Sequence, residues 1–198
     1  MAEAKLGRPR DVQLHHAILE TTRRMLTEHS YAALSMESVA ARARVGKKTL
    51  YRRWSSKAPL VAEAVLDAYG RDGSFPVPDT GDIRRDLGQW LAEHSAFIAE
   101  STNAALIRAL VAASAANPTD NEALYAQLTA PQRDGLVTRL RKGVASGELR
   151  TDADVDAVTD AVIGYLLVHL LAQPALGGSR TLRMDGLLTA LLVGIGND

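Results

Sequence analysis

A short cation-rich segment carries the side chains best suited to binding a polyanion. Turned through about 100° per residue as a helix, residues 47–54 place Leu50 and Trp54 on one face, with Val45 just before it. The donors on the opposite face are Lys47, Lys48, Tyr51 and Arg52, with Thr49 and Arg53 at its flanks. Arg and Lys can donate to guanine in the major groove of DNA, while Thr and Tyr hydroxyls can reach phosphates. The pattern predicts an apolar anchor with a cationic front that fits a major groove, although a solvated cationic face would look the same.

Further cations flank this segment and could contact phosphates. Lys57 falls in the first turn of the next expected helix, where a cation opposes the helix dipole until an anion binds. Ser35 can cap the helix before the segment, and we also assign it to the DNA contacts. Arg8 and Arg10 belong to a basic arm, residues 5–10, whose Gly-Arg-Pro can enter a narrow minor groove. A disordered, solubilising terminus is the alternative for the arm.

No constellation in the sequence favours catalysis, a cofactor or a metal. His15 and His16 are adjacent, so they point in different directions around a helix, unlike an i, i+4 ligand pair. The chain has no Cys, which excludes thiol nucleophiles, disulfides and thiolate metal sites. No Ser elbow, phosphate-binding Gly-rich loop or EF-hand spacing occurs. We expect a protein that is not an enzyme, with a helical enzyme of unfamiliar type or a protein-interaction module as alternatives.

The later part of the chain holds a few large or polar aromatic residues that could shape an amphiphilic cavity. Trp90, His94 and Phe97 share one side of a helix at i, i+4 and i+7 spacing. The other candidates are Tyr125, Tyr165 and His169. We expect these six residues to line the site of an unidentified small molecule, the alternative being ordinary core or interface residues.

Helical periodicity and capping signals predict an all-α chain of about nine helices. The expected helices are 12–29, 36–43, 47–54, 57–69, 83–100, 103–115, 120–146 with a break or kink at Pro131, 153–173 and 181–195. Ser35, Ser55 or Ser56, and Asp82 can cap three of them. Because Glu37 and Ser38 follow Ser35 without a Glu or Gln at the third position, we expect no full capping box there.

The last two expected helices have apolar stripes wider than one core contact needs. A second copy of the chain would cover them most simply, so we expect a homodimer through these helices, the alternative being the core of a monomer. The longest nearly apolar run, residues 161–172, is too short to span a membrane, and residues 1–5 lack the apolar stretch of a signal peptide. We therefore expect a cytoplasmic protein with no membrane partner.

The formal net charge of zero hides an asymmetry. Residues 1–60 hold 12 Lys/Arg against 5 Asp/Glu, whereas residues 61–198 hold 11 against 18. A basic N-terminal part in a neutral chain suggests a polyanionic partner for that part. The balance of 46% hydrophobic and 23% charged residues is that of a globular protein and excludes disorder.

Residues 35–61, Ser-Met-Glu-Ser-Val-Ala-Ala-Arg-Ala-Arg-Val-Gly-Lys-Lys-Thr-Leu-Tyr-Arg-Arg-Trp-Ser-Ser-Lys-Ala-Pro-Leu-Val, resemble the DNA-binding domain of the tetracycline-repressor (TetR/AcrR) family of bacterial regulators. The likeness covers roughly residues 8–65. It implies a helix-turn-helix, a homodimer with one recognition helix per subunit, a palindromic operator, and a C-terminal domain whose small-molecule ligand releases the DNA. Arg44 departs from the pattern, since the family commonly has Gly there. Either Arg44 adopts a positive φ, which costs a non-Gly residue roughly 1 kcal/mol, or the turn differs from that of the family.

Taken together, the sequence predicts an N-terminal arm and helix-turn-helix domain over 1–58 and a helical ligand-binding and dimerisation domain over 59–198. The predicted function is a DNA-binding transcription regulator, in the first place a repressor released by a small molecule. An activator of the same fold is the alternative.

Overall fold

The computed structural model of the chain describes residues 8–69, 76–172 and 184–196, and over these residues it is built from helices. The α-helices are α1 (Arg8–Glu28), α2 (Met36–Arg42), α3 (Lys47–Tyr51), α4 (Lys57–Ala68), α5 (Ile83–Ala99), α6 (Ser101–Ala116), α7 (Pro118–Leu124), α8 (Ala130–Ser146), α9 (Val155–Ala172) and α10 (Met184–Ile195). A 3-10 turn, η1 (Tyr31–Ala33), precedes α2, and a π-helical turn, η2 (Tyr125–Thr129), joins α7 to α8. No strand occurs among the described residues, so the all-α prediction is confirmed.

The chain divides into two compact units, which we describe separately. The first unit comprises Met1–Gly73 and Ala105–Leu128, and the second comprises Ser74–Ala104 and Thr129–Asp198. Helix α4 packs against α1 and α7 inside the first unit. The boundary after residue 58 that the sequence suggested between a DNA-binding and a ligand-binding domain stays a prediction.

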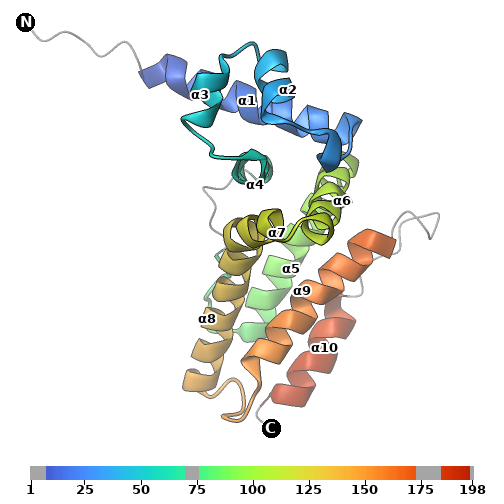
Figure 1. Ribbon diagram of the computed structural model, residues 1–198. Helices are drawn as coiled ribbons and strands as arrows, with labels where there is room; N and C mark the ends of the chain where they lie inside the picture. The colour runs from blue at the N-terminus through green and yellow to red at the C-terminus, as the bar shows by residue number, and fades with distance from the viewer. Residues whose placement is uncertain (1–7, 70–75, 173–183, 197–198) are drawn as a thin grey trace, which may run out of the picture. The chain divides into compact units, whose positions relative to one another are not determined.

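The first unit is organised around α1, which contacts both α2 and α4 (Figure 1). Its core draws Ile18 and Leu19 from α1, Leu50 from α3 and Leu60 from α4, all almost completely buried. These positions belong to the apolar stripes that predicted the helices, and burying each such side chain contributes about 1.5–3 kcal/mol. The same core continues onto α6 and α7 through Leu106 and Leu124.

A full capping box starts α2, contrary to our expectation. The Ser35 hydroxyl accepts a hydrogen bond from the Ser38 backbone N–H at 3.1 Å, and the Ser38 hydroxyl accepts one from the Ser35 N–H at 3.1 Å. Ser38 thus takes the role usually given to Glu or Gln, because a hydroxyl can accept a hydrogen bond as a carboxylate does. Asp82 caps α5 as expected, accepting from the Arg85 N–H at 3.0 Å. Ser56 holds the N-cap position of α4 but makes no capping hydrogen bond with its side chain.

Several helix ends differ from the expected ones. Helix α1 begins at Arg8, so the last three residues of the segment expected as an arm, 8–10, form the first turn of the helix. Helix α3 stops at Tyr51, although the Trp54 N–H still donates to Leu50 O at 3.0 Å. The stretch expected as one helix over 120–146 is continuous but consists of α7, η2 and α8. The π turn ends at Thr129, two residues before Pro131, which has no backbone N–H to donate to a preceding turn.

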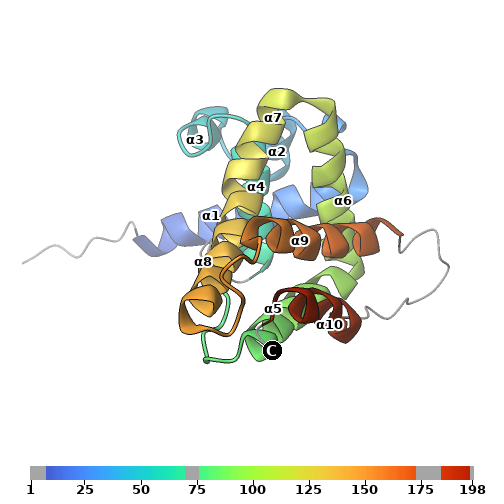
Figure 2. The same ribbon diagram turned by 90° about the horizontal axis from the view of Figure 1, so that it is seen from below.

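The second unit places α5 in contact with α8, α9 and α10 (Figures 1 and 2). Its core is apolar and draws on every one of these helices, from Leu87 and Trp90 through Leu140 and Val162 to Leu188. This unit contains five of the six residues that the sequence assigned to a ligand site.

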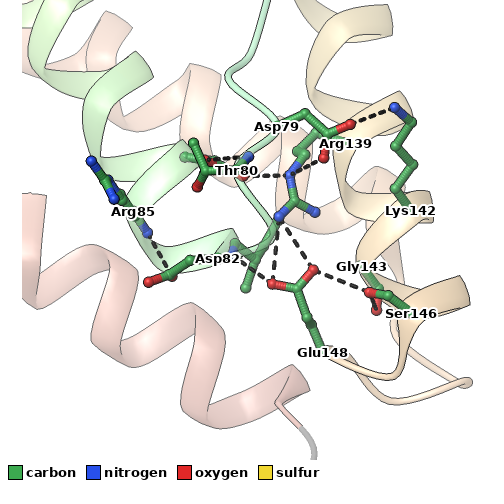
Figure 3. Close-up of polar contacts among 11 residues, drawn as sticks. Asp79, Thr80, Asp82, Arg85, Arg139, Lys142, Gly143, Ser146 and Glu148 are labelled. Carbon is green, nitrogen blue, oxygen red and sulfur yellow. Dashed lines mark hydrogen bonds and ion pairs between the residues drawn. The ribbon is translucent and has the colours of Figure 1, made fainter.

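A buried ion-pair network fastens α5 to α8 in the second unit (Figure 3). Arg139 Nε donates to Asp86 Oδ2 at 2.7 Å, and both side chains are almost fully buried. Arg139 also pairs with Glu148 at 3.2 Å, and Asp79 pairs with Lys142 at 2.6 Å. Burial opposes ionisation of Asp86, but hydrogen bonds from Thr80 and Arg139 outweigh it and lower the pKa of that carboxyl. The network joins residues more than 50 positions apart, so it fixes how these helices meet.

Candidate functional site

Helix α3 has the two faces that the sequence predicted. Leu50 is fully buried and Trp54, just beyond the helix, is 3% exposed. The exposed residues on the other side, which we call the cationic face, are Lys47, Lys48, Tyr51 and Arg52. Thr49 is half-buried at its flank. The arrangement leaves hydrogen-bond donors accessible on a helix whose opposite side is anchored in a core.

Trp54 is the main anchor of this segment. Its indole Nε1 donates to Glu63 Oε2 of α4 at 2.6 Å, and its ring stacks on His15 of α1 with 5.4 Å between ring centroids. Arg53 turns toward α1 as well, where it pairs with Asp11 and lies 3.4 Å from His15 Nδ1. Because its charge already has partners, Arg53 secures the segment to α1.

The turn between α2 and α3 contains Arg44 at φ 56°, the left-handed region. It is the sole non-Gly residue with positive φ in the described part of the chain. The backbone holds it there, since the N–H groups of Arg44 and Val45 donate to Ala41 O at 3.2 Å and Ala40 O at 2.9 Å. Of the two possibilities that the sequence left for this turn, the strained one is present.

Lys57 already has partners inside the first unit. Its Nζ donates to Tyr31 O at 3.2 Å and to Leu34 O at 3.4 Å, and it lies 4.3 Å from the centroid of the Tyr31 ring. Burial, together with the nearby carboxylate of Asp120, raises the pKa of Tyr31, which keeps its hydroxyl protonated. The carbonyls and the ring offset the unfavourable position of Lys57 at a helix start. The dipole argument for a phosphate at Lys57 therefore loses its force.

The remaining predicted DNA contacts divide into two cases. Ser35 is half-buried, and its hydroxyl is engaged in the capping box described above. The backbones of Arg8 and Arg10 belong to the first turn of α1, whereas their side chains lie outside the described part of the structure.

Sequence reasoning missed one residue of this surface, Glu37. It lies at the start of α2, and its Oε1 accepts a hydrogen bond from the Tyr51 hydroxyl at 3.3 Å. The same oxygen is 3.7 Å from Lys47 Nζ. The signal was an acidic residue before a cationic helix, but only the fold shows which donors it meets.

The predicted ligand residues are only partly brought together. Trp90 and His94 of α5 are buried and stacked, with 3.7 Å between ring centroids and His94 Nδ1 2.8 Å from Trp90 O. Among the described residues, the indole Nε1 of Trp90 is a buried donor without a hydrogen-bond partner. Phe97, one turn on, is half-buried. This face of α5 therefore contains an unusual polar feature within an apolar core.

The other three candidates are more exposed. Tyr165 and His169 of α9 are half-buried. Tyr125 is 49% exposed and belongs to the first unit, whereas the other five residues belong to the second. A cavity of about 300 Å³ in the second unit is lined by none of the six predicted ligand residues. Its lining is Pro76, Val77, Asp79, Asp134, Gly135, Thr138, Arg139 and Lys142.

Helix α9 is long and apolar. Over its 18 residues the mean hydropathy is 1.6 and 22% of the residues are buried, so by length and composition alone it could cross a membrane. Its exposed apolar side chains are Leu167, Val168 and Leu171, and α10 adds Val193, which is 75% exposed. Exposed apolar side chains gathered in this way are typical of an interaction surface.

Comparison with known proteins identifies the family. A model described as "Bacterial regulatory proteins, tetR family" matches residues 18–64, and one described as "Tetracyclin repressor-like, C-terminal domain" matches residues 77–183. The chain is 31% identical over 169 residues to the uncharacterized HTH-type transcriptional regulator YdeS of Bacillus subtilis, which spans 85% of this chain and 84% of that protein. The chain belongs to the TetR family. It is a DNA-binding transcription regulator.

Similarity to further TetR-family proteins, in sequence and in structure, supports this assignment. A DNA-binding transcriptional repressor TetR of Mycobacteroides abscessus is 33% identical over 162 residues, or 82% of each chain. The crystal structure of the TetR family transcription regulator SCO0332 superposes with a TM-score of 0.68 at 26% identity, covering 93% of this chain and all of that one. All three of these relatives are named as transcription regulators. The predicted helix-turn-helix and TetR-like fold are confirmed.

Proposed function

We propose that this TetR-family regulator is a homodimeric repressor that inserts α3 of each subunit into successive major grooves of a palindromic operator. The single observation that carries the proposal is α3 itself: Leu50 and Trp54 are buried while Lys47, Lys48 and Arg52 are exposed. Such a helix can enter the groove without disturbing its own domain. Two-fold symmetry of the dimer would be matched by two half-sites about 34 Å apart.

Each exposed residue of the cationic face suits a different part of the duplex. We assign base contacts to Lys48 and Arg52, because both can donate to guanine O6 and N7. Lys47, Thr49 and Tyr51 would position the helix through phosphates, as would Ser35 with its capping box kept intact. We also assign Arg8 and Arg10 to phosphates. Lys57 is assigned to a phosphate as well, where the anion would compete with the carbonyls of Tyr31 and Leu34 for its ammonium group.

The dimer would form through α9 and α10. Their exposed Val168, Leu171 and Val193 are apolar and would be covered by the same helices of a second copy. Covering these side chains removes apolar surface from water at about 25 cal/mol per Å². A soluble dimer of this kind would act in the cytoplasm, without a membrane, a metal or a cofactor.

A small molecule in the second unit would release the DNA. The buried Trp90 Nε1 without a partner, stacked on His94, offers a donor for a ligand acceptor. We include Phe97, Tyr165 and His169 in the ligand site as further aromatic positions of this unit, whereas Tyr125 belongs to the first unit. The ligand would favour a dimer whose two α3 helices are wrongly spaced for successive grooves, a shift of population between two forms.

The test is a fluorescence-anisotropy titration of the full-length protein with duplexes from its own upstream region. Lys48→Ala and Arg52→Ala should weaken operator binding and relax the base preference at the contacted position. Lys57→Ala should weaken binding to all sequences and lower the salt slope by about one unit. Equal losses on operator and random DNA for all three variants would refute the assignment of base-reading residues.

Transcription from the same upstream region distinguishes repressor from activator. We expect deletion of the gene to raise expression from that region, and addition of the ligand to do the same. A fall in expression on deletion would instead establish an activator of the same fold.

A further inference from the structure

One carboxylate of α2, Glu37, lies beside the cationic face and contacts two of the proposed DNA-binding residues. Glu37 Oε1 accepts from the Tyr51 hydroxyl at 3.3 Å and is 3.7 Å from Lys47 Nζ. All three side chains are about half exposed or more. The carboxylate therefore lies between α2 and α3, on the surface that we propose to meet DNA.

Asp11 of α1 pairs with Arg53 at the flank of the cationic face, and three further carboxylates of α1 and α4 are engaged away from it. Glu28 pairs with Arg42, Glu63 accepts from Trp54, and Asp67 pairs with Arg23. Glu37 differs because its partners are donors that DNA phosphates would also attract. Its own backbone N–H, and then Lys47 and Tyr51, lower the pKa of Glu37, so it is ionised at neutral pH.

An ionised carboxylate on this surface is unfavourable beside phosphates and has few partners in the groove. Phosphate oxygens repel it, and guanine N7 and O6 are acceptors like itself. The major-groove groups that can donate to it are exocyclic amines, and Glu is the usual acceptor for the amine of cytosine. A carboxylate here thus disfavours binding to DNA in general and favours a sequence that offers an amine.

We propose that Glu37 is a specificity-determining residue of this regulator: it holds Lys47 and Tyr51 back from indiscriminate phosphate contacts and accepts a hydrogen bond from a cytosine amine in each operator half-site. The inference rests on the proposed entry of α3 into the major groove. It adds a penalty against wrong sequences to the attraction that Lys48 and Arg52 supply, and specificity commonly needs both.

The decisive variant is Glu37→Gln. The Gln side chain keeps an oxygen that can accept from Tyr51 but lacks the negative charge, and its amide suits adenine N6 and N7 better than cytosine. With the full-length protein, binding to a scrambled duplex at low salt should strengthen about fivefold, with little gain on the operator. Selection from a random duplex library should show one position per half-site where the preference for cytosine falls and adenine rises.

Glu28→Gln is the matched control. Glu28 is also half-exposed and pairs with an Arg of α2 at 2.7 Å, yet it contacts no residue of the cationic face in the described structure. It should leave the scrambled-duplex affinity and the selected sequences unchanged. Circular dichroism melting curves of both variants should overlay that of the wild type, which establishes that any change arises at the DNA.

Two outcomes separate this inference from the proposed function. If Glu37→Gln binds scrambled DNA no better and selects the same bases, while Lys48→Ala still loses operator affinity, the role of Glu37 is wrong and α3 recognition stands. If Lys48→Ala and Arg52→Ala also leave operator binding unchanged, the cationic face is not the DNA-binding surface and both proposals fail.

Discussion

Asp86 and Arg139 show how much depends on one buried side chain. Both are almost fully buried and joined at 2.7 Å, with Glu148 and Thr80 completing their hydrogen bonds. Taking two charges out of water is costly, and only complete pairing compensates for it. A buried pair of this kind is therefore sensitive to removal of either partner.

Asp86→Asn should lower the free energy of unfolding by about 3 kcal/mol, because it leaves Arg139 with a buried charge that is only partly compensated. Urea denaturation at pH 7 measures this loss. The control is Asp160→Asn, where an exposed carboxylate 3.2 Å from Arg133 should contribute less than about 1 kcal/mol. Equal losses for the two variants would contradict the role of burial.

The same pair predicts a pH dependence. The folded-state pKa of Asp86 lies below its ordinary value of 3.8, so its contribution is present above that pH and is lost as the pH falls through the folded pKa. Wild-type stability should thus decline more steeply below about pH 4 than that of Asp86→Asn. Parallel declines, measured by urea denaturation at a series of pH values, would show that Asp86 is not preferentially ionised in the folded protein.

At the scale of elements, helical periodicity predicted most of the fold, because an amphipathic helix needs only its own residues to reveal its buried face. Leu50 and Trp54 were assigned to the inner face of α3 and are buried there. The partners of Lys57 and Glu37 could not be predicted, since they lie 10 to 26 positions away along the chain. The Ser35–Ser38 capping box was not predicted, because Ser is less common than Glu or Gln at the third position of such a box.

The turn that joins α2 to α3 carries strain that a substitution can release. Arg44 is held at φ 56°, where any side chain with a Cβ costs roughly 1 kcal/mol relative to Gly. The free energy of unfolding of Arg44→Gly, measured by urea denaturation, should therefore be about 1 kcal/mol higher than that of Arg44→Ala. Comparing Gly with Ala removes the Arg side chain in both variants and isolates the backbone term. Equal stability would show that the turn relaxes to negative φ in solution.

At the scale of the whole molecule, the proposed function needs two copies of a 21.2 kDa chain held in fixed register. Burial of exposed apolar residues of α9 and α10 would stabilise the dimer, because Val168 and Val193 are exposed to water in a single subunit. One subunit offers one α3, and tethering two recognition helices makes the second contact intramolecular. Loss of the dimer should therefore reduce operator affinity far more than random-DNA affinity.

Val168→Glu tests this directly, because a carboxylate at a residue 67% exposed in the single chain costs little there but is buried unpaired in a dimer. Light scattering coupled to gel filtration should give a mass near 21.2 kDa for the variant and about twice that for the wild type. Val12→Glu on α1, where Val12 is 50% exposed, is the control and should remain dimeric. A Val168→Glu protein that stays dimeric would show that the interface does not include this part of α9. A wild type that binds its operator as a monomer would show that operator binding does not require a dimer.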